Sequence, residues 1–184
     1  FTNYGKPDIL VNCAGSGDWK YITEMNKEEI TNCINAPLMS SIWITRKILR
    51  HIPHNSDFQA IFIQSPAIIQ PWKSSTIYTV SRWGLQGLVE ALRADYYKTK
   101  IKIKDIIFGK VNSHYFINNP IASTRMPVLS KFIPTLTLND TSQVIIKSII
   151  SNNNQTIQPF IIRLLTYIHY LFPTVIPMLN NYLD

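Results

Sequence analysis

Short runs of apolar, mostly β-branched residues alternate along the chain with longer stretches whose apolar residues recur at helical spacing. The short runs predict buried strands at residues 8–12, 60–64, 101–107 and 156–161. The longer stretches predict helices at 26–52, 78–98, 139–152 and 162–172, with a polar, proline-containing excursion at 110–137. Strands and helices that alternate in this way are typical of an α/β fold with a parallel sheet.

Local signals refine this pattern. Asn26, followed three residues later by Glu29, forms a capping box that starts the first helix. Pro37 lies inside that helix and should kink it. In the next long helix, Gly84 and Gly87 leave space for close packing against another helix. Pro173 closes the last predicted helix, at residues 162–172.

Size and composition indicate an ordinary globular domain. The chain has 184 residues, of which 46% are hydrophobic and 16% charged. It begins at Phe1, and Phe1 to Lys6 reads like the end of a helix already under way. We therefore expect a piece of a longer protein, in which no targeting segment can be read.

The net charge of +7 is scattered along the chain. Nucleic-acid binding calls for clustered Lys and Arg with interleaved aromatic residues. The nearest cluster, Lys98 to Lys104, alternates lysine with threonine and isoleucine, and we interpret it as a solvated loop that enters an edge of the sheet. No nucleic-acid partner is expected, although a basic surface suits an anionic dinucleotide.

Cysteine and histidine give no metal-site signal. Cys13 and Cys33 each lie within an apolar segment, so neither a disulfide framework nor a cysteine metal site is expected. No metal-ligand spacing relates the four histidines, which are His51, His54, His114 and His169.

Three polar residues follow the second predicted strand. Ser65 comes directly after it, Tyr78 stands thirteen positions later at the start of a helix, and Arg82 lies one helical turn beyond. The i, i+4 spacing places the phenol and the guanidinium on one helix face. Because doubly wound sheets bind ligands outside the carboxyl ends of their strands, we expect these groups to meet there.

Such a trio suits hydride transfer to a carbonyl group. Charge develops on the carbonyl oxygen as the hydride arrives, so a proton donor is needed. A tyrosine hydroxyl ordinarily titrates near about 10, and a fixed cation nearby favours the phenolate. A serine hydroxyl would hold the carbonyl oxygen, as an oxyanion donor does. Each residue alone is more often structural, so the prediction depends on their conjunction.

Three segments resemble the short-chain dehydrogenase/reductase family. PDILVNCAG at Pro7 to Gly15 is similar to the family's ILVNNAG strand segment. Ser65, Tyr78 and Arg82 resemble its catalytic serine, tyrosine and lysine at the family spacing, with arginine in the place of lysine. FGKVNS at residues 108–113 is similar to its PG-x-V-x-T stretch.

The resemblance implies a Rossmann-like, doubly wound parallel sheet whose N-terminal half, with its glycine-rich βαβ units, is missing. Residues 1–184 would form one partial domain, with 159–184 as its apolar C-terminal tail. The implied cofactor is NAD or NADP, and the segment that chooses between them is absent. Asn12 would steady the sheet, and Ser113 would contact the nicotinamide end. The residues matched to cofactor contacts are Asn12, Ala14, Gly15, Tyr78, Arg82, Gly109, Val111 and Ser113.

Three departures from the family pattern bear on activity. Arg82 is planar and always charged, so its reach to the ribose hydroxyls differs from that of lysine; the YTVSRWGL segment resembles a branch in which arginine is regular. The helix asparagine of the family's proton relay falls at Pro37, with Asn35 two positions away. The six glycines form no G-x-x-x-G-x-G turn, so the isolated chain is expected to bind cofactor poorly.

Apolar residues near the trio predict a pocket for a hydrophobic carbonyl or alcohol, although such loop residues are as often simple packing. They are Pro66, Trp72, Tyr115 and Phe116. The tail at residues 160–179 carries Arg163 as its only full charge, and its uninterrupted part is too short to span a bilayer. We favour docking of this tail on the core or on another subunit over a position in a membrane interface.

The leading hypothesis is an NAD(P)-dependent oxidoreductase for a lipophilic carbonyl/alcohol pair. Tyr78 would act as acid and base, Ser65 would position the oxygen, and Arg82 would tune the phenol. Two alternatives stay open: an inactive fragment or dinucleotide-binding interaction protein, and a lipid-surface-associated protein. The resemblance also implies a homodimer or homotetramer that pairs through the helices at 27–52 and 78–98. A cytoplasmic location is expected, with membrane contact through residues 160–179 as an option.

Overall fold

A four-stranded parallel sheet forms the centre of the computed structural model, which describes residues 5–183 without the side chains of Ser123 and of residues 180–183. Its order is β1-β2-β3-β4, with β1 at Ile9–Asn12, β2 at Gln59–Gln64, β3 at Lys102–Phe108 and β4 at Gln155–Gln158. The predicted α/β class and parallel sheet are confirmed. Most of the predicted helix end at Phe1 to Lys6 lies outside the described residues.

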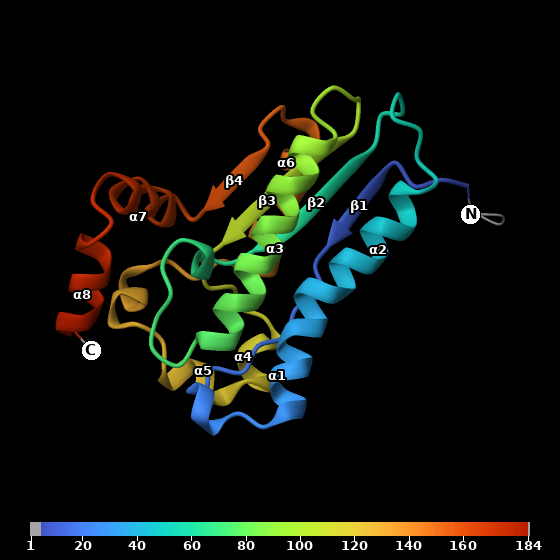
Figure 1. Ribbon diagram of the computed structural model, residues 1–184. Helices are drawn as coiled ribbons and strands as arrows, with labels where there is room; N and C mark the ends of the chain where they lie inside the picture. Colours follow the sequence, from blue (N-terminus) through green and yellow to red (C-terminus); the bar gives the residue numbers. More distant parts are fainter. Residues whose placement is uncertain (1–4, 184) are drawn as a thin grey trace.

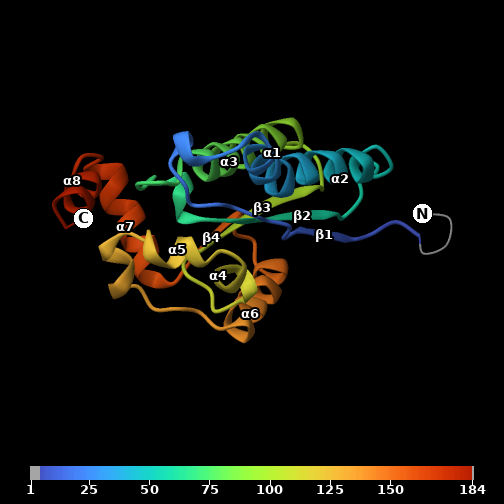
Figure 2. The same cartoon turned by 90° about the horizontal axis from the view of Figure 1, so that it is seen from below.

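Helices cover both faces of this sheet (Figures 1 and 2). One face carries α1 (Lys27–Ile34), α2 (Ser40–Leu49) and α3 (Thr76–Asp95). The opposite face carries α4 (His114–Asn118), α5 (Pro120–Thr124) and α6 (Leu138–Ile150). At the end toward which the strands point lie α7 (Phe160–Leu171) and α8 (Val175–Leu183). The predicted polar excursion therefore contains short helices, α4 and α5, followed by the 3-10 turn η4 (Val128–Phe132).

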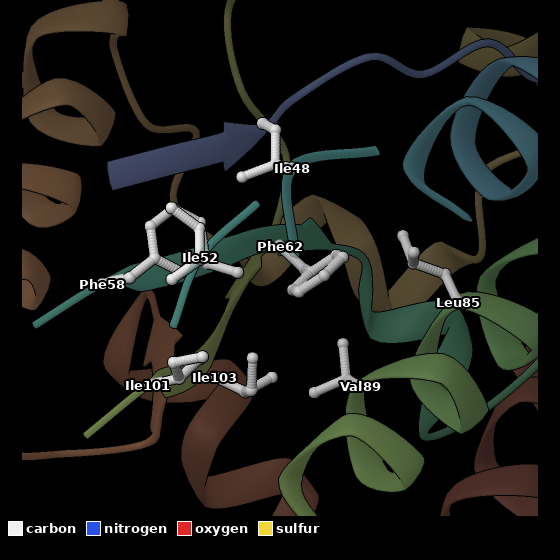
Figure 3. Close-up of a cluster of buried hydrophobic side chains, with 9 residues drawn as sticks. Ile48, Ile52, Phe58, Phe62, Leu85, Val89, Ile101 and Ile103 are labelled. Atoms are coloured by element: carbon white, nitrogen blue, oxygen red, sulfur yellow. The ribbon is translucent and has the colours of Figure 1, made fainter. Parts of the chain in front are cut away.

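Two apolar layers hold the sheet between its helices. On the α3 side, Phe62 packs with Leu85 and Val89 in the larger cluster (Figure 3). On the other side, Ile61 and Ile106 pack toward α6. Since both faces of the central strands are buried, their sequences read as nearly continuous apolar runs, as expected for parallel sheets.

The first predicted helix is interrupted where Pro37 occurs. Asn26 Oδ1 accepts from the Glu29 amide and Glu29 Oε2 accepts from the Asn26 amide, which confirms the capping box. A π-helical segment, η2 (Asn35–Met39), contains Pro37 and joins α1 to α2. The break is expected because proline lacks the amide that would continue the helical hydrogen bonds.

Gly84 brings α3 close to this π-helical segment. A Cβ at Gly84 would lie 2.7 Å from Leu38 Cδ2, so a larger residue at this position would require the Leu38 side chain to move. The matching prediction for Gly87 is wrong within the described structure, since a Cβ there would meet no atom within 4 Å.

The C-terminal part departs from the predicted boundaries. The strand predicted at 156–161 is β4, which ends at Gln158, and α7 already begins at Phe160. α7 ends at Leu171, just before Pro173, as predicted, and a separate helix, α8, begins at Val175. Within the described residues, no helix combines the length and apolarity needed to cross a membrane.

The interpretation of Lys98 to Lys104 as a solvated loop at a sheet edge is wrong for Lys104. This residue lies in β3, which pairs with strands on both sides, and its side chain is fully buried. Lys104 Nζ donates to the carbonyl oxygens of Ser148 at 2.6 Å and Ser151 at 2.7 Å. The ammonium thereby satisfies carbonyl groups that the C-terminal end of α6 leaves without helical partners.

Candidate active site

A cavity of about 470 Å³ opens at the carboxyl ends of β1, β2 and β3. Its walls include residues that directly follow each of these strands: Cys13, Ser65 and Gly109. In a parallel sheet all carboxyl ends reach the same edge, so residues far apart in the sequence meet there. The sequence analysis predicted the candidate catalytic residues at this edge of the sheet.

Ser65, Tyr78 and Arg82 are buried and all line this cavity. Arg82 Cζ lies 5.2 Å from the centre of the Tyr78 ring, so the guanidinium stacks over the ring face. Its Nη1 donates to the Ile63 carbonyl at 3.1 Å, which anchors the side chain to the end of β2. The structure therefore brings the three predicted residues together, with the cation placed over the phenol ring.

The two hydroxyl groups of the trio retain unused hydrogen-bonding capacity. Ser65 Oγ accepts from the Ala67 amide at 3.3 Å, which leaves its own hydrogen without a partner among the described residues. The hydroxyl of Tyr78 likewise has no hydrogen-bond partner in the described part of the chain. Both groups are free to engage a polar atom placed in the cavity.

Most residues matched to cofactor contacts line the same cavity, namely Gly15, Tyr78, Arg82, Gly109, Val111 and Ser113. Asn12 and Ala14 are not among its lining residues. Asn12 is buried, and its Nδ2 donates to Thr45 Oγ1 at 3.3 Å, which links β1 to α2. Ser113 Oγ caps α4 by accepting from the Tyr115 amide at 3.3 Å.

The four predicted pocket residues, Pro66, Trp72, Tyr115 and Phe116, also line the cavity. Trp19, which the sequence analysis missed, packs beside them. Its ring centre lies 4.8 Å from that of Trp72 and 6.0 Å from that of Tyr78. The phenol therefore stands in an aromatic wall, and the turn after β1 contributes as much to it as the loop after β2.

Tyr115 connects this wall to the turn after β1. Its hydroxyl accepts from Trp19 Nε1 at 2.9 Å and donates to the Gly17 carbonyl at 3.1 Å. Burial raises the pKa of Tyr115 well above its ordinary value. Tyr115 therefore stays protonated at neutral pH and serves to hold Trp19 and Gly17 in position.

Gly17 is the point where this turn contacts the Tyr78 ring. A Cβ at Gly17 would lie 2.3 Å from Tyr78 Cδ2, far inside van der Waals contact. We expect Gly17→Ala to displace the phenol and lower kcat by about a hundredfold, because small misplacements of reacting groups are costly. Steady-state kinetics on the full-length protein, with a thermal melt to verify folding, would measure this effect.

Gly87→Ala is the matched control for that variant. It adds the same methyl group inside the helix α3, where no described atom of the same chain lies within 4 Å. Because Gly87 is exposed one turn beyond Trp83, the oligomeric state of both variants is measured together with kcat. It should leave kcat unchanged and raise stability by up to about 1 kcal/mol through helix propensity. Equal kcat in the two variants would contradict the assigned contact between Gly17 and Tyr78.

The far wall of the cavity comes from the C-terminal helices, which the sequence analysis did not connect with the site. Thr166 and His169 of α7 and Ile176 of α8 line it. Thr166 is satisfied by donating to the Ile162 carbonyl at 2.7 Å. His169 Nδ1 is buried and has no partner among the described residues. The tail was predicted to dock on the core, and the inner faces of α7 and α8 do so.

The position of the family's relay asparagine, and the two cysteines, can be placed in the structure. Pro37 is buried, and Asn35 is exposed and does not line the cavity, so Asn35 is not positioned to replace a relay asparagine. Cys13 is exposed and Cys33 is buried, and both are free thiols. Among residues 5–183, no group of His, Cys, Asp and Glu side chains is arranged to hold a metal ion.

The chain is similar to known proteins in both sequence and fold. The family model described as short chain dehydrogenase matches residues 1–121. A sepiapterin reductase of Chlorobaculum tepidum is 30% identical over 108 residues, which cover 59% of this chain and 44% of that protein. The chain spans about half the length of the curated relatives that it matches.

Solved structures give the same fold. A short-chain dehydrogenase from Sphingobium yanoikuyae in complex with NADPH superposes with a TM-score of 0.71, at 15% identity, over 83% of this chain and 57% of that one. A 4-hydroxyisoleucine dehydrogenase complexed with NADH and succinate superposes with a TM-score of 0.66, at 15% identity, over 83% and 66%. At such identities the similarity establishes the architecture alone.

Proposed function

This chain belongs to the short chain dehydrogenase family, and from that premise we propose that it carries the catalytic part of an NAD(P)-dependent oxidoreductase for a hydrophobic carbonyl/alcohol pair. The observation that carries the proposal is the meeting of Ser65, Tyr78 and Arg82 in one cavity at the carboxyl edge of the sheet. Among the described residues, neither hydroxyl hydrogen of Ser65 and Tyr78 has a partner, so both can be donated to an oxygen atom bound in the cavity.

The residues present fit the nicotinamide end of a dinucleotide. Arg82 Nε is buried and lacks a partner among the described residues, so a bound group that offers an acceptor would satisfy it. Gly15, Gly109 and Ser113 border the same space. The related structures named above were solved with NADPH and with NADH, so they leave the choice of cofactor open.

The chain's own groups would supply the proton chemistry. When bound, a nicotinamide supplies or accepts the hydride. Tyr78 would donate its phenolic proton to the carbonyl oxygen as charge develops there, and would take it back when an alcohol is oxidised. Ser65 would donate a hydrogen bond to the same oxygen. Arg82, whose guanidinium lies over the Tyr78 ring, would place a fixed positive charge beside the phenol.

The wall of the cavity supports a hydrophobic substrate. Trp19, Trp72 and Phe116 line the part near the trio, and Ile162 and Ile176 line the far part. Burying the apolar groups of a ligand against such walls stabilises binding by about 25 cal/mol for each Å² of apolar surface removed from water. We therefore propose that the body of the substrate is apolar and extends from Tyr78 toward α7 and α8.

The outer faces of α2 and α3 support a homo-oligomer. Trp43 and Ile44 of α2 and Val80 and Trp83 of α3 are exposed large apolar residues. Exposed apolar groups gathered on two neighbouring helices are typical of subunit contacts. We propose a dimer or tetramer that pairs through these helices.

An assay with the purified full-length protein tests the oxidoreductase proposal. The protein is mixed with NADH or NADPH and with ketones and aldehydes of increasing apolar chain length, and cofactor absorbance is followed. We expect consumption of at least one cofactor, with kcat/KM rising with chain length by about tenfold for every few methylenes. The reverse reaction should proceed with the matching alcohols.

Cofactor binding, measured by fluorescence in the same samples, separates the alternatives. Binding without turnover on any carbonyl or alcohol would favour the dinucleotide-binding interaction protein. Absence of both binding and turnover would overturn the proposed function and favour an inactive product.

A further inference from the structure

The helices α7 and α8 form one end of the molecule, beside the carboxyl ends of the strands (Figures 1 and 2). The inner sides of α7 and α8 pack against the rest of the protein. Ile162 and Thr166 of α7 and Ile176 of α8 are buried, and α7 packs against β4. A helix that only needed to cover the core would be polar on its remaining side.

The outer side of α7 is apolar instead. Phe160, Leu164, Tyr167 and Leu171 follow one another at helical spacing and form a stripe whose members are 42% to 74% exposed. Further exposed apolar residues continue from this stripe along the chain. Together they make the α7–α8 apolar surface, which consists of Phe160, Leu164, Tyr167, Tyr170, Leu171, Phe172, Val175, Met178 and Leu179.

Among the residues that the structure describes, the full charges near this surface are positive. Arg163 is the only full charge in α7, and its guanidinium lies 4.9 Å from the centre of the Phe160 ring. Exposed Lys131 belongs to η4, which α8 contacts. From Ile106 to its last residue the sequence contains two acidic residues, Asp140 and Asp184, and the carboxylate of Asp140 is engaged with Thr137 in the cap of α6.

We propose that the α7–α8 apolar surface docks on an anionic lipid surface. Aromatic side chains together with a long cationic side chain are the groups that settle at the boundary between lipid headgroups and hydrocarbon. A second copy of the chain would bring cations against cations on this face, whereas anionic headgroups complement them. The helices would lie in the interface plane, since α7 has only 12 residues.

This docking would place the lipid beside the proposed substrate cavity. The inner faces of the same two helices supply Thr166, His169 and Ile176 to the cavity wall. The docking stands on the outer surface alone and does not depend on the proposed oxidoreductase activity.

Flotation with vesicles tests the proposal on the full-length protein. The probes are vesicles of phosphatidylcholine alone and of phosphatidylcholine mixed with phosphatidylserine. We expect the wild type to float with the mixed vesicles and to bind pure phosphatidylcholine less. Tyr167→Glu/Leu171→Glu should weaken binding by more than about tenfold, because two buried apolar contacts become charges in the interface. Equal binding to both vesicle types would overturn the electrostatic part of the proposal.

The matched control is Tyr97→Glu/Ile150→Glu, which makes the same change in charge at residues that are 84% and 80% exposed and lie at the ends of α3 and α6. It should float like the wild type. The proposed docking site would be wrong if this control lost vesicle binding, or if the Tyr167→Glu/Leu171→Glu variant kept it. So would a wild type that ignores both vesicles and self-associates through the stripe, since a second copy would then be the occupant.

A single substitution provides a second test in case the Tyr167→Glu/Leu171→Glu variant misfolds. Arg163→Gln keeps an unbranched polar side chain and removes the charge, and it should weaken binding to phosphatidylserine vesicles by about fivefold. Unchanged affinity in this variant would overturn the proposed role of the cation.

Discussion

The Tyr78→Phe variant should bind the nicotinamide cofactor as the wild type does and lose about a thousandfold in kcat. The phenol ring packs with Ile77, Cys33 and Ala67, and a phenylalanine fills the same space. Because the hydroxyl has no partner among the described residues, its removal leaves no buried group unsatisfied. The loss would therefore lie in proton transfer and not in folding.

Tyr97→Phe is the control for this substitution. It removes the same hydroxyl from a side chain that is 84% exposed, and kcat should not change. Steady-state kinetics and cofactor titration by fluorescence are measured on both variants. Turnover by Tyr78→Phe at the wild-type rate would remove Tyr78 from the reaction, while loss of cofactor affinity without loss of kcat would make it a binding residue.

Much of the fold could be predicted because its signals are local. The strands β1, β2 and β3 are apolar runs, of which the central β2 and β3 are buried on both faces, and the bounds of all three fall within one or two residues of those expected. The capping box at Asn26 and the break at Pro37 follow from groups within a few residues of each other. Such features need no knowledge of the tertiary structure.

The wrong predictions concern residues whose environment is set at long range. Lys104 reads as a solvated cation, and it is buried because carbonyls more than forty residues later accept its hydrogens. Phe160 and Ile161 suit a strand by composition, yet the chain turns into α7 there to cover the end of the sheet. Nothing near these residues in the sequence signals either outcome.

The candidate site likewise contains features that could be predicted from local sequence signals and features that depend on long-range contacts. Ser65, Tyr78 and Arg82 lie on consecutive elements, so their meeting could be predicted from strand ends and helical spacing. The stacking of Arg82 over the ring depends on its hydrogen bond to the Ile63 carbonyl, which the i, i+4 spacing does not specify. Trp19 and His169 come from distant turns and helices and carry no local mark of their role.

A buried ion pair gives the second large expected effect. Asp105 of β3 is completely buried, and its carboxylate accepts from Arg93 Nη2 and, at 3.0 Å, from Gln155 Nε2. Arg93 also donates to the carbonyls of Ile103 and Asn154, so it ties α3 to β3 and to the loop before β4. Arg93→Met should lower the free energy of unfolding by about 3–5 kcal/mol, since it leaves a buried charge unpaired.

Two variants isolate this pair in urea denaturation of the full-length protein. Arg93→Met/Asp105→Asn removes both charges and should regain much of the lost stability. Glu90 is the second ion-pair partner of Arg93, and the Glu90 side chain is 56% exposed. Glu90→Gln should therefore lower the free energy of unfolding by less than about 1 kcal/mol. A double variant no more stable than Arg93→Met would mean that lost packing, and not the unpaired carboxylate, causes the effect.

The pH dependence of the Arg93→Met deficit distinguishes these causes further. Burial raises the pKa of the Asp105 carboxyl, and Arg93 opposes that rise, so loss of the guanidinium raises the pKa again. A carboxyl whose pKa is higher in the folded state holds its proton more tightly there than in the unfolded chain. Stability therefore falls as pH rises from about 4, the unfolded value, through the folded pKa. The deficit should be small near about pH 4 and largest near about pH 8. A deficit that is constant across this range would assign it to the lost packing of the arginine side chain.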